Sequence, residues 1–238
     1  MRKYLKTTLI FFLIFSINFQ IIHSSDIEDF FNNLLNNDDN STKTIAKGLK
    51  EALDIGTKRA VKNVSRKNGY FKNNKIKIPL PSKLKKTESI LRPIGFGDTF
   101  DKFILTMNRA AEKAAPKAVN IFVDSIKQMT ITDAVEILNG GDDAATRYFK
   151  KKSYNSLYNV FKPIIRKSIN KVGVTKHYNK IKNKADNIPI LNDYFIELDD
   201  YITQKALEGL FKILAEEEEK IRKNPVKRTT ELLQKVFG

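Results

Sequence analysis

The chain has 238 residues and a formal net charge of +16 at pH 7, which fits one basic domain of ordinary size. It contains no cysteine, which excludes disulfides and thiolate nucleophiles, and any histidine-based triad or zinc site would have to rest on His177 alone. Glycine-rich phosphate loops and nucleophile-elbow motifs are also missing. We therefore expect no catalytic residue of these kinds, no metal and no cofactor.

Residues 1–25 have the pattern of a secretory signal peptide. Their first six residues include three basic ones and no acidic one, and an apolar run follows from Leu9 to Ile17. This run is shorter than the about 20 apolar residues that a membrane-spanning helix needs. We expect export to the periplasm or cell envelope and cleavage of the segment. The alternative is an uncleaved signal that anchors the protein in the inner membrane.

The rest of the chain predicts an all-α fold. Residues 26–42 are rich in Asn and Asp and are expected to form a linker or a short helix. Across 43–238, apolar residues recur at three- and four-residue spacing, and no Gly- or Pro-rich linker interrupts them. This pattern predicts a single bundle-like domain of about eight or nine helices.

The expected elements follow from helix start and stop signals. The first helices span about 42–67 and 82–92, and a third follows the turn at Gly95–Asp98 and is kinked or restarted at Pro116. Between the first two, residues 75–81 alternate like a strand, but two prolines limit them to an edge or an extended segment. The later elements are a short helix capped by Thr132 and ending at Asn139, one capped by Asp142 or Asp143, one beginning at Ser153, one after Gly173, the longest from about Glu197 to Lys223, and a final turn from Thr229.

Several short motifs follow one another in a distinctive order. They are LKEAL (49–53), NGY (68–70), IPLP (78–81), NRAAE (108–112), MTITDA (129–134), AAT (144–146), KALEGLF (205–211) and the ending from RTT to VFG (228–238). In this order and spacing, the chain resembles the domain-of-unknown-function family 4197, a set of exported bacterial proteins, over about residues 43–238. The resemblance implies a helical, exported protein and no particular reaction, because the family has no assigned activity.

The positive charge is concentrated in two segments. Residues 58–92 hold 12 lysines and arginines against one acidic residue, Glu88, and residues 147–184 hold 12 and no acidic residue. Such segments favour an anionic partner, which in the envelope would be a membrane surface or a wall polymer. Nucleic acid is not the expected partner, because tyrosines at helical spacing more often bury their rings than stack on bases. The alternative is a lysine-rich, solvated helix face.

Two groups of polar residues are candidate ligand-binding sites. Asn108, Arg109 and Glu112 share one helix face, where Arg109 could hold an anion and Glu112 could orient it. The alternative is a buried ion pair that fixes the register of packed helices. The second group surrounds Gly140 and Gly141 and could hold a cation through carboxylates or an anion at a helix start, or could simply cap two helices. Its members are Asp133, Asp142, Asp143, Thr146 and Arg147.

The acidic run Glu216–Glu219 is expected to be solvated helix surface, with Glu218 and Arg222 forming an i, i+4 pair. Four consecutive residues fan out around a helix, so they cannot face one ligand together.

Three functions remain open. The favoured one is a non-catalytic envelope protein that binds an anionic or amphipathic partner through the two basic segments. The first alternative is an enzyme that uses carboxylates and arginine, centred on Arg109, Glu112, Asp133 and Asp143, which would have to converge on an open cleft. The second is a carrier of an apolar ligand, which requires an enclosed apolar cavity.

Overall fold

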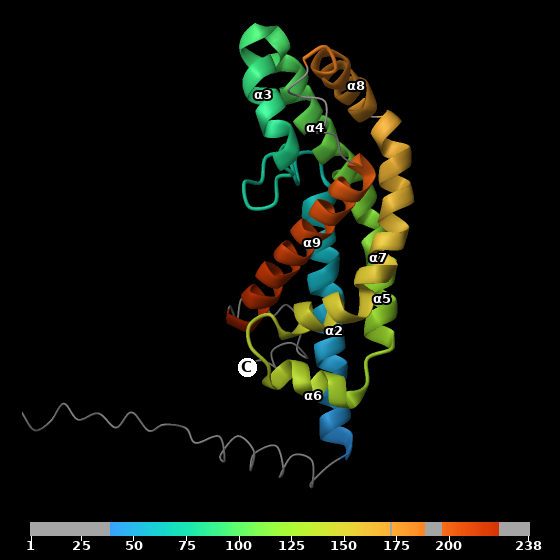
Figure 1. Ribbon diagram of the computed structural model, residues 1–238. Coiled ribbons are helices and arrows are strands. Elements are labelled where there is room, and N and C mark those ends of the chain that lie inside the picture. Colours follow the sequence, from blue (N-terminus) through green and yellow to red (C-terminus); the bar gives the residue numbers. More distant parts are fainter. Residues whose placement is uncertain (1–38, 172, 189–196, 224–238) are drawn as a thin grey trace, which may run out of the picture. The chain divides into compact units, whose positions relative to one another are not determined.

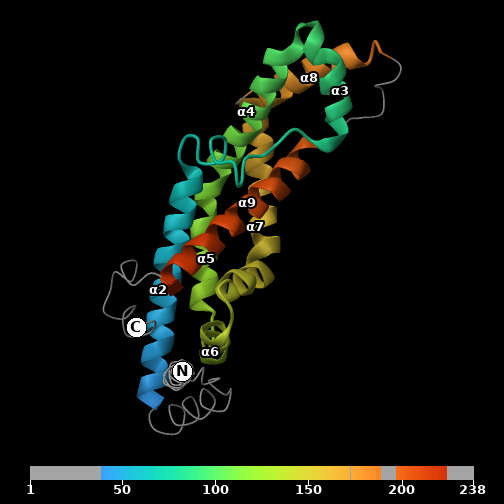
Figure 2. The same ribbon diagram turned by 90° about the vertical axis from the view of Figure 1, so that its left-hand side faces the viewer.

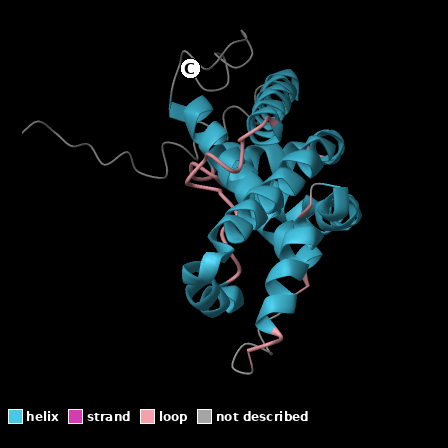
Figure 3. Cartoon of the chain, turned by 90° about the horizontal axis from the view of Figure 1, so that it is seen from above, coloured by secondary structure: helices cyan, strands magenta, loops and turns pink. Residues whose placement is uncertain are grey.

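The structure, a computed structural model, describes residues 39–171, 173–188 and 197–223. Every regular element in these ranges is a helix, and none is a strand, which confirms the all-α prediction (Figure 3). Contacts divide the chain into residues 1–42 and 43–238, and the arrangement below concerns the second unit. The predicted signal peptide and the turn expected at Thr229 lie outside the described residues.

The described helices are identified in Figure 1. In chain order they are α2 (Asp39–Ser65), η1 (Ser82–Leu84), α3 (Lys85–Leu91), η2 (Arg92–Phe96), α4 (Gly97–Ala114), η3 (Ala115–Lys117), α5 (Ala118–Lys127), α6 (Ile131–Asn139), α7 (Ala144–Lys171), α8 (Val174–Ala185) and α9 (Leu198–Lys223). The predicted total of eight or nine helices also concerns residues outside the described ranges and stays a prediction. Within the second unit, α3 and α8 lie at one end and α6 at the other (Figures 1 and 2).

Helix α7 corrects the prediction that a new helix begins at Ser153. The helix runs unbroken for 28 residues and is also longer than α9, which has 26. The Ser153 hydroxyl donates to the carbonyl of Phe149 at 2.6 Å. This bond to the preceding turn satisfies the hydroxyl inside a helix, so the serine need not mark a helix start.

The cap of α6 is Thr130, two residues before the predicted Thr132. The Thr130 hydroxyl accepts from the backbone N–H of Asp133 at 3.0 Å, and the Thr130 N–H donates to the Asp133 carboxylate at 2.9 Å. This reciprocal pair is a capping box, which requires the carboxylate three residues after the cap. Thr130 meets that spacing with Asp133, and Thr132 lies inside the helix.

The core lies where α4 and α5 pack against α7 and α9. Small residues on α4, η3 and α5 allow the close approach and are fully buried: Ala110, Ala111, Ala114, Ala115 and Ala118. The ring of Phe122 meets those of Phe149 and Phe211 edge-on, with centroids 5.3 and 6.1 Å apart. Burial of these rings supplies a large share of the apolar area that stabilises the bundle.

Tyr70 draws the segment between α2 and η1 into this core. Its side chain is fully buried, and its hydroxyl donates to the Ala206 carbonyl of α9 at 2.7 Å. Burial raises the pKa of this phenol well above its usual value, so it stays a hydrogen-bond donor. Gly209, one turn further along α9, leaves room for the ring.

Gly209→Ala should lower the free energy of unfolding by about 1–3 kcal/mol through overpacking. The new methyl carbon would lie 2.8 Å from the Tyr70 ring and 3.1 Å from Cβ of Ile76. Gly56→Ala is the matched control, because the nearest atom is the flexible end of Ile221 at 3.3 Å and alanine gains about 1 kcal/mol of helix propensity. Urea unfolding followed by circular dichroism measures both variants, and equal losses would contradict the predicted contact.

Candidate functional site

Asn108 of α4 holds the extended segment that follows Tyr70. Its side-chain oxygen accepts from the N–H of Ile78 at 2.8 Å, and its amide nitrogen donates to the Ile78 carbonyl at 2.9 Å. The same nitrogen donates to the carbonyl of Ile104 on its own helix at 2.8 Å. Asn108 is fully buried, so its polar groups are satisfied by backbone groups of this chain.

Arg109 and Glu112 lie beside Asn108 and contact the same segment. The buried Glu112 carboxylate accepts from the N–H groups of Tyr70 and Phe71 at 3.2 and 3.3 Å and from Arg109 at 2.5 Å. Arg109 also donates to the side-chain oxygen of Asn68 at 2.7 Å and lies over the Phe71 ring. The predicted constellation is therefore brought together, and its polar groups bind residues 68–78 of the same chain.

Thr146, from the second predicted group, binds a carboxylate supplied by α9. Glu218 accepts from the N–H groups of Ala145 and Thr146 at 2.9 and 2.8 Å and from the Thr146 hydroxyl at 2.8 Å. Free N–H groups at a helix start attract an anion, and here the anion is a side chain of the protein. Arg222 donates to Glu218 at 3.0 Å and to the carbonyl of Ile137 at the end of α6 at 2.7 Å.

The prediction of a solvated surface was wrong for Glu217 and Glu218, which are 8% and 6% exposed. Glu217 forms an ion pair with Lys220 at 2.7 Å, and Glu218 lies deeper in the helix packing. Glu218 pairs with Arg222 as predicted, but the pair lies between three helices. A sequence signal for this burial exists, because Glu218 follows Leu214 by four residues and precedes Ile221 by three. It therefore falls within the apolar stripe of α9.

The remaining members of the second group make separate contacts. Asp133 completes the cap with Thr130, and the pKa of its carboxyl lies below its usual value because the Thr130 N–H and hydroxyl both donate to it. Asp143 forms an exposed ion pair with Arg147 one turn along α7.

These positions weaken two of the three functions. Arg109 and Glu112 bind the segment after α2, whereas Asp133 and Asp143 act at the ends of α6 and α7, so these four residues do not form one cleft. The apolar recess between α2, α7 and α9, lined in part by Leu53 and Leu214, has a volume of about 20 Å³, which is room for about one water molecule.

Part of the basic segment 147–184 is paired with acids of α9. Lys162 lies 2.5 Å from Asp200, and Arg166 lies 2.6 Å from Asp199, whose side chain is buried. Hydrogen bonds from Lys162 and Tyr158 hold the pKa of the Asp200 carboxyl below its usual value. These contacts fix α7 against the first turns of α9.

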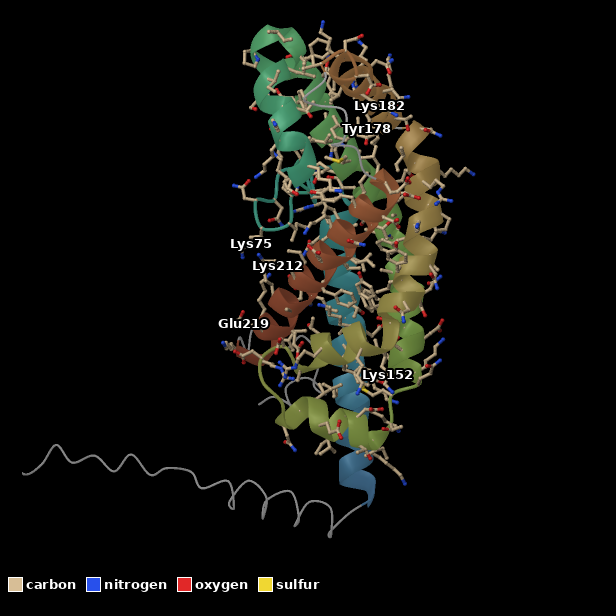
Figure 4. All side chains as sticks on the ribbon, in the orientation of Figure 1. Lys75, Lys152, Tyr178, Lys182, Lys212 and Glu219 are labelled. Atoms are coloured by element: carbon tan, nitrogen blue, oxygen red, sulfur yellow. The ribbon has the colours of Figure 1, made fainter. Side chains whose placement is uncertain are left out.

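Most other lysines of this segment face solvent. Within the part of the chain that the structure describes, no carboxylate lies within 4.0 Å of the exposed ammonium groups of Lys150, Lys151, Lys152, Lys167, Lys176, Lys180 and Lys184. Figure 4 shows where Lys152 of α7 and Lys182 of α8 lie. Because α8 contains four lysines and no acidic residue, its outer surface is strongly positive.

His177 shows the electrostatic effect of these lysines. Its pKa lies below the usual 6.5 because of partial burial and the nearby charges of Lys102, Lys176 and Lys180. Lys102 belongs to α4, on which α8 packs through stacking of Phe103 on Tyr178 at 5.7 Å. Lys102 and the lysines near His177, Lys176 and Lys180, therefore form one positive region.

The basic side chains of the segment 58–92 include two groups. One lines a groove, and the other lies on the helices η1 and α3. The groove has a volume of about 720 Å³ and is lined by Arg66, Lys67 and Lys72 and by residues of α9. Two α9 glutamates also enter it, and the ion pair of Lys75 with Glu216 at 2.8 Å bridges the two sides. Lys83, Lys85 and Lys86 are exposed at η1 and α3.

These features define a basic, all-helical protein whose buried polar clusters are satisfied by its own chain. The family model for the protein of unknown function DUF4197 matches residues 39–238, so the chain belongs to this family and the resemblance of its motifs is confirmed. No curated protein and no solved structure matches the chain. Among the described residues, no helix is long and apolar enough to cross a bilayer, and no group of three acidic or histidine side chains could hold a metal ion.

Glu218→Ala should lower the free energy of unfolding by about 3–5 kcal/mol, because the largely buried Arg222 loses its carboxylate and the start of α7 loses its cap. Glu219→Ala is the matched control. This neighbour is 52% exposed in its ion pair with Lys223, and such pairs contribute under about 1 kcal/mol. Chemical denaturation of both variants measures the difference. Similar small losses would show that Glu218 does not anchor α7.

Proposed function

We propose that this protein is exported to the bacterial envelope and binds an anionic surface there without catalysing a reaction. The observation that carries the proposal is a set of exposed lysines on α7 and α8 that have no carboxylate within 4.0 Å among the described residues, namely Lys150, Lys151, Lys152, Lys167, Lys176, Lys180 and Lys184. Export is supported by the signal-like pattern of residues 1–25, a basic start followed by a short apolar run.

The charge arrangement favours a surface over a small ligand. The lysines are spread along the lengths of two helices, which suits a partner with many separated negative charges. Each lysine near an anionic membrane contributes about 1 kcal/mol, and this attraction falls off within a Debye length of about 10 Å at 0.1 M salt. Several lysines together are therefore enough for binding that depends strongly on salt.

The inner polar clusters support binding over catalysis. A catalytic pair of carboxylates needs access to a substrate, but Glu112 and Glu218 are both buried and each accepts hydrogen bonds from backbone N–H groups. The hydrogen bonds that Glu112 and Glu218 accept within the fold explain why these carboxylates are buried, and no substrate is needed to explain it.

The protein should co-sediment with vesicles that contain phosphatidylglycerol, or with purified cell-wall material, at low salt and be released at high salt. The triple variant Lys176→Gln, Lys180→Gln, Lys184→Gln should bind at least about tenfold more weakly, since three lysines contribute about 1 kcal/mol each. The matched control is Lys113→Gln, Lys117→Gln, Lys212→Gln, which removes the same charge from exposed positions outside α7 and α8. Equal weakening in both variants, or no salt-sensitive binding to either material, would overturn the proposal.

The pKa of His177 on α8 offers an independent test of binding at the lysine-rich surface. Because neighbouring lysines disfavour its protonation, the pKa of His177 should rise when a bound anionic surface offsets their charge. It should also rise in Lys176→Gln, Lys180→Gln without any partner. Imidazole proton shifts followed by nuclear magnetic resonance across pH 5 to 8 report both changes. An unchanged pKa in the vesicle-bound protein would show that α8 does not face the surface.

A further inference from the structure

The turn between α3 and α4 exposes an apolar tip. Its exposed residues are Pro93, Ile94 and Gly95, and Ile94 is 57% exposed, whereas the neighbouring Phe96 is half-buried and packs against the core. The other large exposed apolar side chains in the described ranges, Ile131 and Val160, are exposed by 43% and 38%. An isoleucine exposed at the end of a helical hairpin gains free energy when it moves from water into an apolar phase.

The tip is held in one conformation by Arg92. The guanidinium of Arg92 donates to Glu88 of α3 at 2.6 Å and to Asp101 of α4 at 2.9 Å, and it also reaches the carbonyl of Gly97. Gly95 allows the reversal with a φ of 95°, which side-chain-bearing residues rarely adopt. The exposure of Ile94 is therefore built into a braced turn.

The charges around the tip are mostly positive. Lys83, Lys85 and Lys86 are exposed on the α3 side, and Lys102 lies on the α4 side. Arg92 forms ion pairs with both Glu88 and Asp101, so its single positive charge offsets one of their two negative charges. Asp98, in the first turn of α4, is the remaining acid of this turn.

The lysine-rich helix lies at the same end of the unit as this tip. Figures 1 and 2 both place α8 beside α4, near the turn that joins α3 to α4. The stacking of Phe103 on Tyr178 and the effect of Lys102 on His177 confirm that α8 packs on the first half of α4. One end of the unit therefore combines an apolar tip with positive charge on both sides.

We infer that the anionic surface is a lipid bilayer and that Ile94, with its flanking turn, inserts among the acyl chains while the lysines of η1, α3 and α8 and Lys102 of α4 contact the phosphate headgroups. This inference rests on the proposed function and names its partner. An apolar tip gains free energy when it leaves water for the acyl chains of a bilayer, whereas an anionic wall polymer offers it charge and no apolar phase. Combining apolar insertion with basic residues is also how peripheral proteins reach stable membrane binding from weak single contacts.

A single-tryptophan experiment tests the insertion directly, because the chain contains no tryptophan. Ile94→Trp should show a blue-shifted emission maximum, and protection from an aqueous quencher, when vesicles of phosphatidylglycerol and phosphatidylcholine are added. Ile131→Trp is the control, since this exposed isoleucine lies at the start of α6, at the opposite end of the unit (Figures 1 and 2). Its emission should not change. Circular dichroism establishes that both variants are folded.

A second pair of variants measures the contribution to affinity. Ile94→Glu should weaken vesicle binding about tenfold or more, because it replaces the apolar side chain that inserts into the bilayer with a charged one. Ile131→Glu should leave vesicle binding unchanged. Co-sedimentation of Ile94→Trp with vesicles without a spectral shift would overturn insertion and leave the proposed function standing. Binding to cell-wall material but not to vesicles would likewise overturn insertion and leave the proposed function standing. Equal shifts at positions 94 and 131 would overturn the inference, and binding to neither material would overturn the proposed function as well.

Discussion

Helix α9 supplies carboxylates that fix α7 near both of its ends. Glu218 receives the free N–H groups at the start of α7, while Asp199 and Asp200 bind Arg166 and Lys162 in its second half. Sliding or rotating α7 would separate these pairs and leave charge buried without a counter-charge, which costs several kcal/mol. The two long helices, α7 and α9, are therefore held in one register. Helices α4, α5 and α8 pack against this fixed pair.

The same contacts determine which charges reach solvent. The acids of α9 bind the half-buried Lys162 and the exposed Arg166. The other lysines described above are exposed and have no carboxylate within 4.0 Å in the described ranges, namely Lys150, Lys151, Lys152, Lys167, Lys176, Lys180 and Lys184. On α4, Arg109 and Glu112 are used to bind the segment that carries Tyr70. The basic residues therefore form two groups. One group stabilises the fold through ion pairs, and the other lies exposed at the surface. This division supports binding to an anionic surface over a charged active site.

The sequence predicted what depends on local periodicity. The amphipathic spacing of Leu49 to Val64 and the glycine and proline signals located most helices, because apolar faces at i, i+3 and i+4 are local properties. It also placed Asn108, Arg109 and Glu112 on one helix face. Their partners lie about 30 to 42 residues earlier in the chain, and those of Glu218 lie 72 or 73 residues earlier. Such contacts depend on how the helices pack, so periodicity could not reveal them. The break predicted at Ser153 failed for a different, local reason, since a serine hydroxyl can also bond to the preceding turn of its own helix.

Lysine acetylation with and without phosphatidylglycerol vesicles, read by mass spectrometry, tests the division of charge most directly. In the free protein, the account predicts fast reaction at Lys176, Lys180 and Lys184 and slow reaction at Lys162, whose ammonium group binds Asp200. With vesicles, the three α8 lysines should become protected while Lys212 keeps its rate. Fast reaction of Lys162 in the free protein, or equal protection of Lys212 and the α8 lysines, would contradict the account.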